Sequence, residues 1–328
     1  MIKEKIKKNK LIIITFIVFT ILFLFPLPFY IEKDGGLIPT KDRIKIENNV
    51  ESSGNFYMAY VSEIKVNIPT YIISFFKKDW KLIPKNAVIY INETEEDSNF
   101  RSKLLLQESI SNAVISSFTL AQKQINVIKE NCYITYVDES AKTDLKIQDK
   151  ILKINNVIIN NKSDISKVIN DANDMINIEV ENNGSIYLRT AKLINLNGNK
   201  AIGVMITTDK VIETNPKISN DFKKSESGSS GGLMLALEIY NNLIEEDISK
   251  NRKIAGTGTI DELGNVGQIS GVNFKLKGAY KEGTEIFLVP NGENYAEAVK
   301  VASEDKLNIK IIGVSTLGEA IEKLKEGS

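Results

Sequence analysis

An uncharged apolar run near the N-terminus constrains this chain more than any other feature. The run is LIIITFIVFTILFLFPLPFYI, at residues 11–31. At about 1.5 Å per residue, some twenty helical residues match a hydrocarbon core of roughly 30 Å. A segment that is apolar on every face fits poorly on the surface of a globular domain. We therefore expect residues 1–31 to form a lysine-rich start and one transmembrane helix, broken near its outer end by Pro26 and Pro28.

The charges before the run predict its orientation. Residues 2–10 carry five lysines and one glutamate, which favours a cytoplasmic N-terminus. Everything after residue 31 is then expected outside the cell, on a single-pass protein of the cell membrane. A cleaved signal peptide is the alternative, but it requires a shorter apolar stretch and small residues at the cleavage site. Here the run continues into Phe29-Tyr30-Ile31-Glu32-Lys33.

Two absences narrow the possible chemistry. The chain has no histidine, and its single cysteine is Cys132. Ser-His-Asp and Cys-His sites, His/Cys zinc sites and a disulfide framework are therefore excluded. The 42 basic and 42 acidic residues balance, so no broad basic field indicates nucleic acid. No phosphate-binding GxxxxGK[ST] occurs, and we expect no ATP, metal or other cofactor.

A length of 328 residues allows about two domains, and the patterns predict a mixed α/β (α+β) fold. Residues 32–126 are expected to hold a partly linker-like stretch at 32–54, a strand at 56–66 and an amphipathic helix at 99–124. Between them lies the apolar patch TYIISFFKKDW, at 70–80. This patch is too short, and too charged at its end, to span a membrane.

Residues 127–196 are predicted to form a separate β-rich domain. Short strand-like runs surround one helical segment at 162–174, and Asn155-Asn156 marks a turn. This succession resembles a PDZ domain, whose LKxGDxIxxVNG pattern is matched by Leu145, Asp149, Ile151 and Asn155. The resemblance implies that a peptide could pair with the strand beginning at Cys132, Tyr133 and Ile134. The preceding loop, 129–132, lacks the usual glycines, so a spacer that guards or orients the next domain is an equal alternative.

Residues 197–328 predict a compact α/β domain, with strands at 201–208, 253–260, 284–290 and 309–314. In this domain Gly228-Ser229-Ser230-Gly231-Gly232 precedes a strongly apolar helix. Glycines allow a tight turn, and a serine at a helix start lies beside free backbone N–H groups. Those groups could stabilise an oxyanion. An ordinary helix cap is the alternative.

A serine nucleophile needs a base, and without histidine a buried lysine is the remaining good candidate. Lys275 lies in GQISGVNFKL, at 267–276, among small and apolar residues. An exposed helix lysine is the alternative, and it is the role we expect for Lys277.

Taken together, these motifs resemble the Lon-type Ser-Lys peptidase domain. Family members carry GPSAG at the position of 228–232 and GGLKEK at the position of 270–275, with a TGE strand between them. The resemblance implies Ser230 as nucleophile, Lys275 as base, and Thr257 as the residue that holds the lysine, with Gly228 and Gly231 in support. The family's proline and alanine are Ser229 and Gly231 here. The acidic residue often found three before the serine is Ser227, which leaves Glu226 as a weak candidate for a carboxylate helper.

The whole layout resembles the membrane-bound PDZ-Lon-like proteases of Gram-positive bacteria. The resemblance implies an ATP-independent serine endopeptidase that cleaves extracellular peptides or unfolded proteins and could assemble as a homo-oligomer. A catalytically inactive scaffold of the same fold is one alternative. A β-lactamase-like acyl transferase is another, but it would place the lysine three residues after the serine, where this chain has Leu233.

Overall fold

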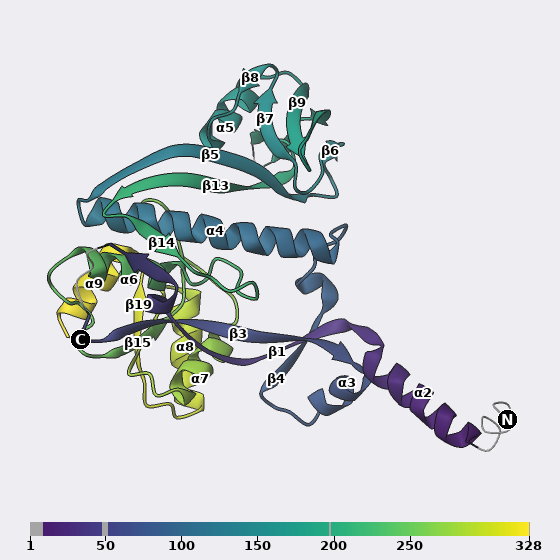
Figure 1. Cartoon of the computed structure of the whole chain (residues 1–328), viewed down its shortest axis with the longest axis vertical. Coiled ribbons are helices and arrows are strands. Elements are labelled where there is room, and N and C mark those ends of the chain that lie inside the picture. Colours follow the sequence, from purple (N-terminus) through teal and green to yellow (C-terminus); the bar gives the residue numbers. More distant parts are fainter. Residues whose placement is uncertain (1–8, 48–51, 197, 328) are drawn as a thin grey trace.

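The computed structural model describes residues 9–47, 52–196 and 198–327, and its fold is mixed α/β with two large sheets (Figure 1). The N-terminal helix projects from one end of the molecule, and the C-terminus lies toward the other. Most of the lysine-rich start, residues 1–8, lies outside the described residues.

The apolar run near the N-terminus divides into a helix and a strand. Helix α2 spans Lys10–Leu24, and strand β1 spans Pro26–Pro39. Proline lacks the backbone donor that a helix interior requires, so Pro26 and Pro28 explain the break. The expected helix over 11–31 is therefore corrected to one of 15 residues. None of the helices in the described ranges is both long enough and apolar enough to cross a membrane.

A six-stranded mixed sheet carries the larger part of the molecule. Its order is β19 (Lys310–Val314), β18 (Ile286–Pro290), β15 (Lys253–Gly256), β3 (Asn55–Asn67), β1 and β4 (Trp80–Pro84). β15 runs parallel to β3 and β18, whereas β1 is antiparallel to β3 and β4. The strand expected at 56–66 is confirmed. The linker expected at 32–54 is wrong in its first half, because β1 is an inner strand of this sheet.

Helices cover both faces of this sheet. On one face lie α6 (Gly232–Leu243) and α9 (Leu317–Lys325), with α4 (Glu95–Leu120) packed against α6. On the other lie α7 (Val272–Lys281) and α8 (Glu293–Glu304). Strand β18 serves both cores, since Ile286 and Leu288 face α6 while Phe287 and Val289 face α7. This division follows the two-residue period of a strand.

A second, seven-stranded sheet forms the β-rich unit. Its order is β13 (Val204–Asn215), β5 (Gln124–Val137), β7 (Lys150–Ile154), β9 (Met175–Asn182), β10 (Ser185–Lys192) and β6 (Lys142–Thr143), with β8 (Val157–Ile158) beside β7. Helix α5 (Lys162–Asp171) packs onto its separate core. The expected strand pair, helix and final hairpin are confirmed, and Asn155 and Asn156 turn with positive φ.

The β-rich unit extends further along the chain than expected. The strand predicted at 201–208 was assigned to the last domain, but β13 pairs with β5 from Val204 to Asn215. The unit is thus an insertion between α4 and the short strand β14 (Ile218–Asn220), and it does not end at residue 196. Figure 1 shows α4 lying between the β5–β13 ribbon and the six-stranded sheet.

The remaining elements are short. They are α3 (Ile68–Ser74), β2 (Ile44–Ile46), β11 (Ile194–Leu196), β12 (Asn199–Ala201), β16 (Thr259–Ile260), β17 (Val266–Gly267) and the 3-10 turns η1 (Thr40–Asp42) and η2 (Lys85–Ala87). β2 pairs with β14 and so connects the N-terminal segment to the chain that leads into α6.

Candidate active site

Ser230 lies at the end of a glycine-rich loop that leads into α6. Gly228 has a φ of 86°, a backbone conformation that favours glycine. A Cβ atom on Gly231 would lie 2.5 Å from the Met58 sulfur, and one on Gly232 would lie 2.7 Å from Ser109 Oγ. These two glycines therefore let the start of α6 approach β3 and α4 closely.

Lys275 comes from the first turn of α7, on the opposite face of the sheet from α6. The helix begins after Gly271, which has a φ of 73° and whose Cβ would lie 2.8 Å from Val61 Cγ2. Only 4% of Lys275 is exposed. Burial lowers the pKa of its ammonium group from 10.5 to about 8, while the carboxylates of Glu32 and Glu63 act in the opposite direction.

The structure brings the three principal predicted residues together. Lys275 Nζ lies 3.0 Å from Ser230 Oγ and 3.1 Å from Thr257 Oγ1. Thr257 follows β15 and is fully buried. Its hydroxyl donates to the backbone oxygen of Ser230 at 3.0 Å, and the N–H of Gly258 donates to the same oxygen at 2.8 Å. One short segment thus holds both the serine and the lysine.

Two backbone donors remain available beside Ser230. In the part of the chain that the structure describes, the N–H groups of Ser230 and Gly231 make no hydrogen bond. Both precede the first turn of α6, where the helix dipole adds a positive potential. The arrangement can therefore accept negative charge that develops next to Ser230.

Part of the chain also matches known proteins, although no family model matches it. The Lon protease of Campylobacter concisus is 31% identical over 97 residues, which is 30% of this chain and 12% of that protein. Those of Mesomycoplasma hyopneumoniae (36% over 91 residues; 28% and 10%) and Mycoplasma mobile (34% over 99; 30% and 12%) match similarly. The chain is Lon-like over this part. It spans only about a tenth of the length of the curated relatives it matches.

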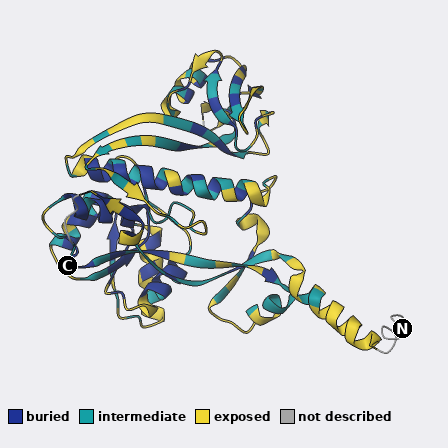
Figure 2. Ribbon diagram, viewed as in Figure 1, coloured by how far each residue is buried: buried dark blue, intermediate teal, exposed yellow. Residues whose placement is uncertain are grey.

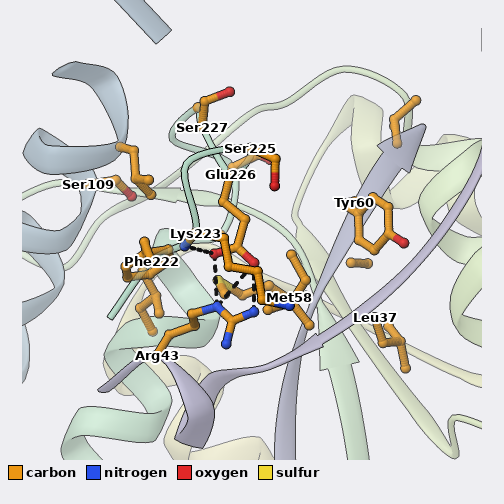
Figure 3. A pocket seen from close by; sticks show the side chains of 18 of the residues that line it. Leu37, Arg43, Met58, Tyr60, Ser109, Phe222, Lys223, Ser225, Glu226 and Ser227 are labelled. Carbon is orange, nitrogen blue, oxygen red and sulfur yellow. Dashed lines mark hydrogen bonds and ion pairs between the residues drawn. The ribbon is translucent and has the colours of Figure 1, made fainter. Parts of the chain in front are cut away.

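The site at Ser230 opens into a cleft of about 870 Å³. Ser230 and Gly231 line it together with residues 58–61 and 63 of β3, of which Figure 3 labels Met58 and Tyr60. β15 pairs with β3 only as far as Met58. Among the described residues, no strand pairs with the Ala59–Glu63 edge on that side. The cleft therefore offers unpaired backbone groups beside the serine.

Glu226, the weak candidate for a carboxylate helper, is paired with Arg43. Its oxygens accept bonds of 2.7–3.1 Å from the guanidinium of Arg43, as the dashed lines in Figure 3 show. Burial acts to raise the pKa of Glu226, but the hydrogen bond from Arg43 keeps it below its ordinary value. The pair anchors the loop before Ser230 to the segment between η1 and β2.

Sequence reasoning missed Arg43, Glu32 and Glu63. Glu32 of β1 lies directly opposite Glu63 of β3, and both carboxylates act on Lys275. Burial raises the pKa of Glu63, and Glu32 adds to that effect. No motif marks these three residues, and two of them lie in the stretch interpreted as a linker.

The peptide-binding role expected for Cys132, Tyr133 and Ile134 does not fit the structure. The segment 129–132 is not a loop, because β5 runs continuously through it. At Cys132 and Tyr133 this strand pairs with β13 on one edge and β7 on the other, which leaves no edge for an added peptide. Burial of the Cys132 thiol raises its pKa to about 12, so it is also a poor nucleophile.

Lys277, expected to be an exposed helix lysine, lies on α7 but is only partly exposed. This lysine pairs with Asp305 at 2.6 Å. It therefore provides a surface control for Lys275, two residues away on the same helix.

Proposed function

We propose that this chain is a serine endopeptidase in which Ser230 is the nucleophile and Lys275 is the general base. The observation that carries the proposal is the 3.0 Å contact between Ser230 Oγ and the buried Lys275 Nζ. A pKa of about 8 leaves part of the lysine neutral near physiological pH. A neutral amine has the free electron pair that a base requires.

The hydrogen bonds of Thr257 support this direction of proton transfer. A hydroxyl has one hydrogen, and that of Thr257 goes to the Ser230 carbonyl. Its oxygen therefore accepts an N–H from Lys275, which leaves the lysine electron pair for the proton of Ser230. As that proton moves to Nζ, Oγ bonds to the peptide carbonyl carbon and the carbonyl π electrons move to oxygen.

The remaining steps use the same groups. The N–H groups of Ser230 and Gly231 would stabilise the oxyanion. The Lys275 ammonium donates the proton taken from Ser230 to the leaving amine as the C–N bond breaks and an acyl-enzyme forms. Neutral Lys275 then takes a proton from water as the water oxygen bonds to the ester carbon. When the ester C–O bond breaks, the Lys275 ammonium gives that proton to Ser230 Oγ and the carboxylic acid product leaves.

The cleft favours an extended peptide as substrate. The unpaired edge of β3 at Ala59–Glu63 can hydrogen-bond a peptide main chain as an added strand. We propose unfolded proteins or peptides as substrates, because a folded protein does not present its backbone in this form. We also propose that hydrolysis is ATP-independent, since the sequence has no GxxxxGK[ST].

The placement at a membrane belongs to the same proposal. Helix α2 has no buried residue, and eleven of its fifteen residues are large exposed apolar side chains. We propose that α2 inserts into the cell membrane with the catalytic unit outside the cell. The PDZ resemblance and the homo-oligomer stay predictions.

Cleavage of an unstructured, fluorophore-quenched peptide by the purified full chain tests the proposal. Ser230→Ala and Lys275→Met should each lower kcat by about a thousandfold or more, while Lys277→Met should leave it unchanged. Lack of cleavage and of fluorophosphonate labelling in the unaltered chain would support the inactive scaffold. Acylation of Ser230 by penicillin would instead favour the acyl transferase.

A further inference from the structure

The apolar patch at residues 70–80 is uncovered in the structure. Its side chains belong to α3 and the turn that follows. Ile72, Ile73, Phe75 and Phe76 are exposed, with Phe76 reaching 81%. Ile72 and Ile73 lie on α3, and Phe75 and Phe76 follow it. Phe75 contacts the Tyr71 ring at 5.1 Å between ring centroids, yet all four side chains stay mostly exposed, which is uncommon for large apolar groups so close together.

This patch continues the apolar surface of α2. The side-chain amide of Asn67, the residue that caps α3, donates to the backbone oxygen of Phe23 at 2.8 Å. The rings of Phe29 and Tyr71 lie 5.7 Å apart. Figure 1 shows α2 and α3 together at the end of the molecule farthest from α6, and Figure 2 shows that α2 is largely exposed and α3 partly so.

Positive charge borders the patch. Residues 77–85 contain four lysines and one aspartate, and Lys77, Lys78, Lys81 and Lys85 are all exposed. Lys81 lies 3.7 Å from a Glu32 oxygen, and the other three make no ion pair within the described ranges. Exposed apolar side chains next to several lysines are typical of segments that bind an anionic lipid surface.

We propose that α3 and its following turn form a second membrane contact, in which Ile72, Ile73, Phe75 and Phe76 insert between lipid headgroups. The lysines beside them would meet anionic headgroups. This inference rests on the membrane placement proposed above, and it is independent of the Ser-Lys chemistry. A contact at α3 in addition to α2 would fix the tilt of the catalytic unit relative to the bilayer.

The occupant is a bilayer rather than a second copy of the chain. Helix α2 exposes apolar side chains on every face, whereas one protein partner would cover only one face. A symmetric copy would also bring two sets of lysines together, which costs free energy. A bilayer with anionic lipids satisfies both features.

Trp80 provides an internal probe, because it is the only tryptophan in the chain and begins β4 between Lys78 and Lys81. The full chain is reconstituted in phosphatidylglycerol-containing vesicles, with or without bromine on the acyl chains near the headgroups. We expect brominated lipid to quench Trp80 emission. Replacing phosphatidylglycerol by phosphatidylcholine, or introducing Lys77→Gln with Lys78→Gln, should reduce the quenching.

Matched variants separate α3 from the effect of α2 alone. Phe75→Ser with Phe76→Ser should restore Trp80 emission, while Leu263→Ser, a change at an 87% exposed site on another turn, should not. Peptide cleavage in detergent should be the same in the unaltered chain, in Phe75→Ser with Phe76→Ser and in Leu263→Ser. A failure of the membrane-contact inference is therefore distinct from a failure of the peptidase proposal. Quenching that is absent, or insensitive to Phe75 and Phe76, would overturn the inference. A second result would also overturn it. If iodide in detergent quenches Trp80 less as the protein concentration rises, a second copy of the chain covers the patch.

Discussion

Burial of Lys275 is the residue-scale feature on which the proposed chemistry depends, and it has a cost in stability. Its pKa is about 8 in the folded chain and 10.5 when unperturbed, so between these values the unfolded state binds more protons. Stability therefore rises with pH through this window, and below about pH 8 the full penalty applies. Ser230 and Thr257 are the hydrogen-bond partners of the Lys275 ammonium group.

Lys275→Met should accordingly stabilise the fold at neutral pH. The pKa shift corresponds to roughly 3 kcal/mol, which lost hydrogen bonds reduce to an expected gain of about 1–3 kcal/mol. The gain should disappear as the pH approaches 10.5, the unperturbed pKa of lysine. Urea unfolding at neutral and alkaline pH measures this, with Lys277→Met as the surface control. A loss of stability at neutral pH in Lys275→Met would contradict the expectation.

Glu32 should set the operating pH of the site. Burial lowers the pKa of Lys275, and Glu32 is the larger of the two carboxylate effects that raise it. Glu32→Gln removes that charge, so the lysine pKa should fall and the acidic limb of the kcat/KM profile should move to lower pH. Glu297→Gln, on the exposed side of α8, is the control and should not move the limb. A shift of the acidic limb to higher pH in Glu32→Gln would show that the Glu32 carboxylate does not raise the pKa of Lys275.

The sequence predicts the central residues of the site but not those around them. Ser230, Lys275 and Thr257 lie in short motifs that resemble those of the Lon-type peptidase domain, and that resemblance implies their roles. Arg43 and Glu32 come close to the site through the pairing of β2 with β14 and of β1 with β3. Such long-range pairings have no local sequence signal.

At the scale of elements, glycines determine how closely the helices approach the sheet. Gly271 and Gly283 have nearly the same φ, 73° and 74°, so an alanine at either position is strained by about 1 kcal/mol. Only Gly271 also has a close neighbour, because a Cβ there would lie 2.8 Å from Val61. Comparing Gly271→Ala with Gly283→Ala therefore isolates the effect of the contact with Val61 on the position of α7.

Gly271→Ala should therefore lower the free energy of unfolding more than Gly283→Ala does. It should also slow the reaction of Ser230 with a fluorophosphonate. We expect an additional loss of about 1 kcal/mol or more in urea unfolding, with slower fluorophosphonate labelling of Ser230, because the start of α7 must move away from β3. Gly283→Ala should label at the normal rate. Equal labelling by the two variants would show that the contact at Val61 does not position Lys275.

Regular elements with strong local patterns were predictable, and pairings between distant ones were not. The Asn155-Asn156 turn, helix α5 and the strands beside them follow from turn residues and apolar periodicity. Strand β1 was missed in part because Gly35 and Gly36 are typical of a linker, although a Cβ at Gly35 would collide with the Tyr60 backbone. Strand β13 was recognised as a strand but assigned to the wrong sheet.

At the scale of the whole molecule, the β-rich unit is tied to the six-stranded sheet through its long ribbon. Thr208 of β13 donates from both its N–H and its hydroxyl to Glu108 of α4. Lys210 pairs with Glu262 at 2.5 Å, which joins β13 to the turn between β16 and β17. The ribbon therefore contacts both the helix behind Ser230 and a turn that leads toward α7.

Lys210→Met should loosen this connection without unfolding the chain. Glu262 is about half exposed, so water can solvate its carboxylate and the stability change should stay within about 1 kcal/mol. Amides of residues 261–267 should exchange with deuterium faster, as measured by mass spectrometry. Lys129→Met, on the exposed face of β5, should leave their exchange unchanged. Identical exchange in both variants would show that the ion pair does not hold the turn.

The most direct test of the central claim is the pH dependence of Ser230 acylation by a fluorophosphonate. If neutral Lys275 takes the serine proton, the second-order rate should rise about tenfold per pH unit and level off above the lysine pKa of about 8. Lys275→Met should lose both the rate and its pH dependence. A rate that is flat across this range, or that survives in Lys275→Met, would contradict the account.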